Sequence, residues 1–163
     1  MQSEAVHQAI ELSPADQAAA PVGHYRLRGA LLLAPCLVLV WLSFLLAPRD
    51  AAYGTHEQLG LPACSFLSRT GYPCPSCGMT TAFAAMAHGR VALAFEAQPF
   101  GMVLFVAVCV VGAAALAELI TGRDVLRHLR PGAWWAASVA VGLAAGWGLK
   151  VLCGLAGGTL PIR

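Results

Sequence analysis

The chain has 163 residues, of which 58% are hydrophobic and only 11% are charged, and its mean hydropathy is +0.69. Because soluble domains carry about a quarter charged residues, this composition excludes an ordinary water-soluble protein and predicts an integral membrane protein surrounded by the lipid bilayer. The net charge is only +2, and nothing resembles the basic face that binds nucleic acid, so we expect no nucleic-acid partner.

Residues 1–23 are polar and rich in alanine, and they include Pro14 and Pro21. We expect a flexible cytoplasmic tail here, followed by a single membrane domain over residues 24–163. No basic stretch leads directly into an apolar core, so the start of the chain does not resemble a secretory signal.

Three apolar segments each approach the roughly 20 residues that a helix needs to cross a bilayer. We expect transmembrane helices over residues 29–47, 100–120 and 133–156. Two charged residues, Glu118 and Lys150, lie within these segments. Each lies toward one end of its helix, so we expect Glu118 to reach the interface and Lys150 to snorkel toward it.

Small residues recur in the third segment, among them Gly142 and Gly146. They would let another helix approach closely. Helix packing within the chain is the simpler explanation. The alternative is a membrane-protein partner that docks on this span, which would make the chain a structural or assembly subunit.

The arginines indicate the orientation of the spans, because cytoplasmic loops carry an excess of positive charge. The segment over residues 48–99 has its arginines mixed with acidic residues. We therefore expect a bacterial inner-membrane protein with a cytoplasmic N-terminus and an extracytoplasmic segment 48–99. The arginines that support this orientation flank the first span or lie between the second and third: Arg26, Arg28, Arg123, Arg127 and Arg130.

Within this segment, residues 49–70 have the glycines and prolines of a loop. The apolar pattern after it predicts a short helix over residues 78–87, a break at Gly89 and a second short helix to about Ala97. Pro99 then begins the second span. Neither short helix can cross a bilayer, so we expect an interfacial or re-entrant helical hairpin.

Six cysteines fall into two groups. The first group lies in the apolar segments, where a free thiol behaves as a small hydrophobic side chain. The second group lies in the polar segment, and its odd number excludes a complete set of internal disulfides there. The first group is Cys36, Cys109 and Cys153, and the second is Cys64, Cys74 and Cys77.

The second group predicts a metal site. The Cys-x-x-Cys turn lets two thiolates converge, and Cys64 supplies a third. Zinc commonly takes three cysteines and one histidine. His56 and His88 are the candidates for the fourth ligand. His88 precedes a glycine at the expected end of a helix, where a histidine caps the helix, so His56 is the favoured ligand beside Cys64, Cys74 and Cys77.

Two alternatives remain open for the same turn. If a helix begins just after it, Cys74 lies near a helix N-terminus, which favours a thiolate. Cys74 and Cys77 would then form the redox pair of a thiol–disulfide protein, although a second cysteine pair to relay electrons is missing. The other alternative is a purely structural turn, held by its prolines and one disulfide.

The run "LPACSFLSRTGYPCPSCGMTTAFAAMAHG", followed by "ALAFEAQPF", resembles the small bacterial membrane proteins catalogued as domain of unknown function 2752. The similarity extends over residues 53–102. The chain departs from the family pattern at Thr81, where many members have arginine, and at Gln98, where asparagine usually precedes the proline. The resemblance implies a multi-pass membrane protein and brings no established activity. The residues that carry it are Cys64, Cys74, Pro75, Cys77, Gly78, Thr80 and Gly89.

The sequence thus predicts an all-α integral membrane protein with three transmembrane helices and a short helical hairpin between the first and the second. Its cysteine segment predicts a metal site, with zinc as the expected ion, beside the redox and structural alternatives.

Overall fold

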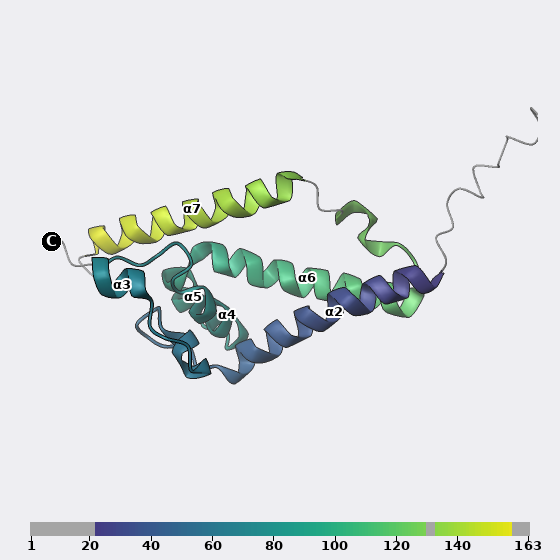
Figure 1. The fold of residues 1–163 in the computed structure, drawn as a ribbon, viewed down its shortest axis with the longest axis horizontal. Coiled ribbons are helices and arrows are strands. Elements are labelled where there is room, and N and C mark those ends of the chain that lie inside the picture. Colours follow the sequence, from purple (N-terminus) through teal and green to yellow (C-terminus); the bar gives the residue numbers. More distant parts are fainter. Residues whose placement is uncertain (1–21, 130–132, 158–163) are drawn as a thin grey trace, which may run out of the picture.

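The computed structural model describes residues 22–129 and 133–157, and every regular element in these ranges is helical (Figure 1). Of the predicted tail, only Val22 and Gly23 are among them. The α-helices are α2 (Val22–Leu45), α3 (Ser65–Thr70), α4 (Met79–Ala87), α5 (Val91–Ala97), α6 (Pro99–Thr121) and α7 (Ala133–Ala156), and the 3-10 helices are η1 (Thr55–Leu59) and η2 (Val125–Leu129).

Three of these helices are long and apolar enough to cross a membrane: α2 from Gly23 to Leu45, α6 from Pro99 to Thr121, and α7 from Trp134 to Ala156. The prediction of three spans is confirmed. The first helix begins earlier than the apolar pattern indicates and includes Arg26 and Arg28, because no proline separates these arginines from the apolar run.

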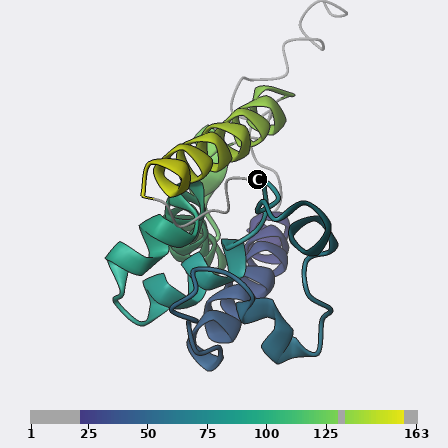
Figure 2. The ribbon, with the colours of Figure 1, turned by 90° about the vertical axis from the view of Figure 1, so that its left-hand side faces the viewer.

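The helices α2 and α6 lie side by side at one end of the molecule and diverge toward the other (Figure 1). Their close approach depends on Gly29, because a β-carbon there would lie 2.8 Å from the carbonyl oxygen of Ala115. The helices α4 and α5 fill the space between the diverging ends. Viewed from that end, α7 lies across α6 on the opposite side from α2 (Figure 2).

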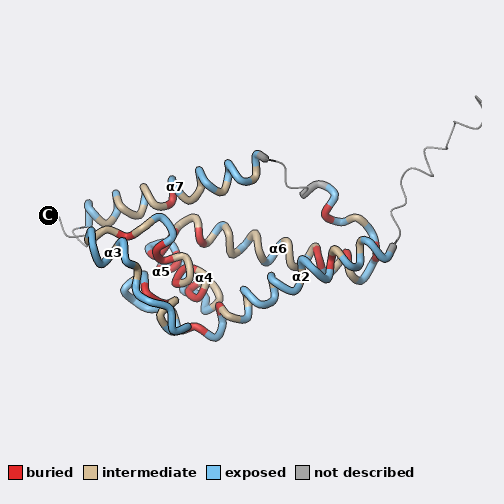
Figure 3. Tube along the Cα trace, viewed as in Figure 1, coloured by how far each residue is buried: buried red, intermediate tan, exposed pale blue. Residues whose placement is uncertain are grey.

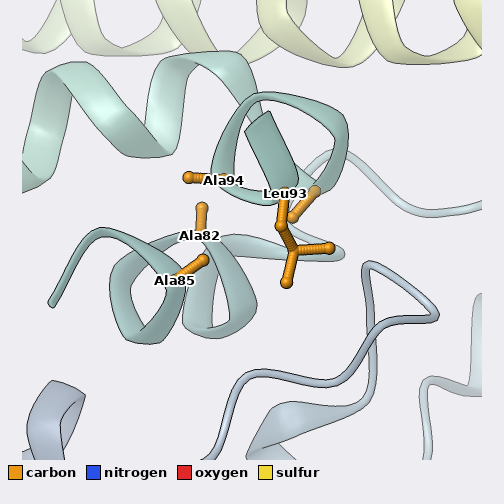
Figure 4. Close-up of a cluster of buried hydrophobic side chains, with 5 residues drawn as sticks. Ala82, Ala85, Leu93 and Ala94 are labelled. Carbon is orange, nitrogen blue, oxygen red and sulfur yellow. The ribbon is translucent and has the colours of Figure 1, made fainter. Parts of the chain in front are cut away.

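The predicted hairpin is confirmed, with α4 and α5 as its two arms. Four of the five buried side chains between them are alanines, so the two helices pack closely (Figure 4). They form the most deeply buried part of the molecule, whereas the outer faces of α2 and α7 are exposed and apolar, as lipid contact requires (Figure 3). The buried cluster consists of Ala82, Ala85, Leu93, Ala94 and Ala97.

Two glycines of α7, Gly142 and Gly146, pack inside the chain. A β-carbon on Gly142 would overlap the ring of Phe100 in α6, and one on Gly146 would lie 2.9 Å from Phe100 Cβ. Contact with α6 therefore explains both glycines without a partner protein.

The expectation that Glu118 reaches the interface is wrong. Its side chain is fully buried between α2 and α6. It accepts hydrogen bonds from Arg28 Nε at 3.0 Å and from Arg28 Nη2, and Arg28 also pairs with Asp124 at 2.5 Å. A buried carboxylate needs such a partner, so this ion pair joins the two helices at the end where they converge.

The segment over residues 49–70 is not a continuous loop, because it contains η1 and α3. Both helices are too short to produce a periodic pattern of apolar residues. Each instead ends at a glycine in the left-handed conformation, η1 at Gly60 with φ 76° and α3 at Gly71 with φ 75°.

Candidate metal centre

The three cysteines of the polar segment converge in the structure. Cys64 directly precedes α3, while Cys74 and Cys77 belong to the turn before α4. Their sulfur atoms all lie within 4.8 Å of one another. A tetrahedral site with zinc–sulfur bonds of about 2.3 Å needs sulfurs about 3.8 Å apart, so the thiols are close to the geometry of a metal site.

Local hydrogen bonds and one glycine shape the turn. The N–H of Cys77 donates to the carbonyl oxygen of Cys74 at 2.9 Å, and the sulfur of Cys74 lies 3.3 Å from the Ser76 hydroxyl. Gly78 follows with φ 90°, a conformation that side chains other than glycine rarely adopt. This positive φ directs the chain into α4.

Donors from α7 and from the start of α6 fix the backbone of this turn from outside. Three alternate carbonyl groups of the turn accept hydrogen bonds from side chains that are distant in the sequence. The bonds run from Trp147 Nε1 to Pro73 O (2.7 Å), from Gln98 Nε2 to Pro75 O (2.9 Å), and from Lys150 Nζ to Cys77 O (3.2 Å).

Lys150 therefore does not snorkel, contrary to the sequence-based expectation. Its ammonium group donates to Ala97 O at 2.7 Å as well as to Cys77 O, so it joins the cysteine turn to the end of α5. Gln98 is fully buried, and its Oε1 has no hydrogen-bond partner among the described residues. No sequence pattern connects either residue to the cysteine site, because both are distant from it along the chain.

The protein environment gives the thiols of Cys64 and Cys77 different pKa values. The backbone N–H of Leu67, in the first turn of α3, favours the Cys64 thiolate and, with the neighbouring thiols, lowers the pKa of Cys64 to about 7. Burial raises the pKa of Cys77 to about 12, and its interaction with Cys64 acts in the same direction. Near neutral pH the cluster thus holds one partly ionised thiol beside a protonated one.

The expected position of Cys74 at a helix N-terminus is wrong. The helix α4 begins at Met79, five positions after Cys74, because the turn continues to Gly78. The cysteine next to a helix N-terminus is Cys64, before α3.

His56 lies near the cluster but outside it. With Cys64 and Cys77 it lines a cavity of about 210 Å³, and its Nε2 donates to Pro62 O at 3.2 Å. His88 closes α4, as expected, and its Nδ1 donates to Ala84 O at 2.8 Å.

A hydrogen bond between two buried threonines holds η1, which carries His56, against α4. Thr81 Oγ1 donates to Thr55 Oγ1 at 2.8 Å. Thr81 is one of the two positions at which the chain departs from the family pattern. Its side chain here has a packing role between the two helices.

A larger cavity of about 610 Å³ is lined by Lys150 and Pro73 but by none of the three converging cysteines, so it is separate from the thiol cluster. All six cysteines are free thiols. Cys36, Cys109 and Cys153 lie in the three long apolar helices, as their sequence context indicates.

Among known proteins, the chain matches one protein family. No curated protein and no solved structure matches the chain. Residues 64–112 match the model of the family described as "Protein of unknown function (DUF2752)", which confirms the resemblance that the cysteine motif indicates. The matched segment begins at Cys64, contains all three converging cysteines and extends into α6, and the description of the family assigns it no activity.

Proposed function

We propose that this chain is a multi-pass membrane protein that binds a metal ion, with zinc as the expected ion, through Cys64, Cys74 and Cys77. The observation that carries the proposal is the convergence of the three sulfurs within 4.8 Å. Three thiolates form a soft ligand set that suits zinc.

The pKa values of the thiols support this ligand set and make metal binding depend on pH. Cys64, with a pKa of about 7, is partly ionised at neutral pH, whereas the proton of Cys77, with a pKa of about 12, has to leave when a metal binds. Metal binding therefore releases protons and weakens as the pH falls.

His56 is the proposed fourth ligand. Its Nε2 donates to Pro62 O, and a carbonyl partner on one ring nitrogen is the arrangement by which metal-binding histidines are commonly oriented, with the other nitrogen, here Nδ1, as the ligand atom. Ligation would bring the imidazole across the cavity of about 210 Å³ that it shares with Cys64 and Cys77.

We place the protein in a bacterial inner membrane with the cysteine centre outside the cytoplasm. The distribution of charge supports this orientation. Arg26 and Arg28 at the start of α2 lie at the same end of the molecule as η2 with Arg127, and the cysteine segment lies at the other end (Figure 1). The positive-inside rule assigns the arginine-rich end to the cytoplasm.

Metal analysis of the detergent-purified protein tests the proposal. We expect one equivalent of metal in the wild type, and loss of it in C64S, C74S and C77S. The variant C109S is the matched control, because it removes a thiol from α6 without touching the centre. A wild type with less than about a tenth of an equivalent contradicts the proposal.

A thiol–disulfide activity is the second candidate, and the placement of the Cys74 and Cys77 sulfurs within 4.8 Å of each other favours it. In the simplest reaction, the thiolate of Cys74 attacks a disulfide of a partner protein and releases one partner thiolate. Cys77 then attacks the mixed disulfide, so that a Cys74–Cys77 disulfide forms and the partner leaves with both its cysteines reduced. Thiol trapping in cells should then find the pair in both states, and a single fixed state counts against this candidate.

A further inference from the structure

We infer that Lys150 is a positioning residue of the cysteine centre, and that its ammonium group supplies the positive charge that balances the thiolates when a metal is bound. The inference rests on the metal-binding function proposed above. It extends that function to a residue in a transmembrane helix, 73 positions after Cys77.

The contacts of Lys150 place a cation directly behind the turn. Its Nζ donates to Cys77 O at 3.2 Å and to Ala97 O at 2.7 Å, and its side chain is partly buried. The ammonium group also interacts electrostatically with the thiols of Cys77 and Cys74. None of the ion pairs within the described part of the chain involves Lys150.

A lysine in a membrane-spanning helix is costly unless something balances its charge. The two carbonyl groups that accept hydrogen bonds from Lys150 are neutral. Asp50 and Glu96 line the same cavity as Lys150, but neither forms an ion pair with it. Three thiolates around a divalent ion carry one net negative charge, which is costly in a partly buried site for the same reason. The bound centre and Lys150 would therefore stabilise each other.

Trp147 is the control that distinguishes the effect of the charge of Lys150 from the effect of its hydrogen bonds. It lies one turn before Lys150 on α7 and donates to Pro73 O at 2.7 Å. Both side chains thus hold the cysteine turn against α7, but only Lys150 carries a charge. A purely structural role for α7 would make the two residues equivalent for metal binding.

The test compares K150M, K150R and W147F with the wild type in detergent. Zinc affinity is measured by competition with a chelator, and the cobalt-substituted protein reports thiolate ligation by its charge-transfer absorption. We expect K150M to bind zinc roughly 10- to 100-fold more weakly, the loss typical of residues that support metal ligands. K150R should stay close to the wild type, and W147F, which loses one hydrogen bond to the turn but no charge, should lose clearly less affinity than K150M. Thermal unfolding of the metal-free proteins identifies any general loss of stability.

Three results would overturn the role of Lys150: unchanged affinity in K150M, an equal loss in W147F, or no rescue by K150R. If K150M does not fold, K150Q replaces it, because glutamine keeps a hydrogen-bond donor and removes the charge. A wild type that binds no metal refutes the metal-binding function and the role of Lys150 together. If the wild type binds metal and K150M binds it equally tightly, only the role of Lys150 is refuted.

Discussion

Gly78 and Ala97 approach so closely that a methyl group on Gly78 would overlap the carbonyl oxygen of Ala97. The same oxygen accepts a hydrogen bond from Lys150 at 2.7 Å. One peptide group therefore connects the cysteine turn, the end of α5 and α7. The position of the cysteines depends on this contact.

Replacement of Gly78 by alanine should destabilise the protein far more than the same change at Gly89. Both glycines have positive φ, 90° and 71°, so each variant carries the left-handed strain of about 1–2 kcal/mol. Only at Gly78 would the new methyl group also meet backbone, the carbonyl oxygens of Ala97 and Ala52, whereas nothing lies within 4 Å at Gly89. Thermal unfolding in detergent measures the difference, and equal losses would contradict the close packing of the turn.

Cys64 should be the most reactive thiol of the cluster in the metal-free protein near neutral pH. Its pKa is lowered to about 7, against about 8.5 for an ordinary cysteine, so the thiolate forms as the pH rises through 7. Cys77, with a pKa of about 12, should hardly react. Alkylation followed by peptide mass spectrometry gives the rate at each cysteine, and a half-maximal rate of Cys64 near pH 8.5 would contradict the assignment.

The lowered pKa of Cys64 also makes the stability of the folded protein depend on pH. Because the pKa of Cys64 is lower in the folded than in the unfolded protein, its thiolate stabilises the folded state at alkaline pH. This contribution is lost as the pH falls through about 7. The variant C64S should remove that part of the pH dependence of thermal unfolding.

The two glycines of α7 should respond differently to a change in Phe100. In G142A the new methyl group meets the outer atoms of the Phe100 ring, whereas in G146A it meets Phe100 Cβ and the backbone nitrogen. Each variant should lose about 1–3 kcal/mol, the usual cost of overpacking. Adding F100L should restore stability in G142A and leave G146A impaired. Rescue of both, or of neither, would contradict this packing of α7 on α6.

The long helices and the hairpin could be predicted from sequence because their signals are local. Three apolar runs have the length of a membrane span, and Gly89 and Pro99 separate the short helices. The turn itself was also predictable, since the glycine after Cys77 indicates the positive φ that Gly78 has.

The roles of the intramembrane charges could not be predicted, because they depend on distant partners. Glu118 and Lys150 each lie toward an end of an apolar helix, where interfacial contact is the usual outcome. In the folded chain Glu118 pairs with Arg28, and Lys150 binds carbonyl groups of the cysteine turn. Both pairings require the packing of helices that are far apart in the sequence.

The most direct test of the metal centre is the zinc X-ray absorption spectrum of the purified protein, with C74S and C109S measured beside it. The spectrum counts the sulfur neighbours of the ion. We expect three sulfurs at about 2.3 Å and one lighter ligand in the wild type and in C109S. In C74S, zinc that is still bound should have only two sulfurs. Zinc surrounded by nitrogen and oxygen alone in the wild type, or a spectrum that C74S leaves unchanged, would contradict a centre built by Cys64, Cys74 and Cys77.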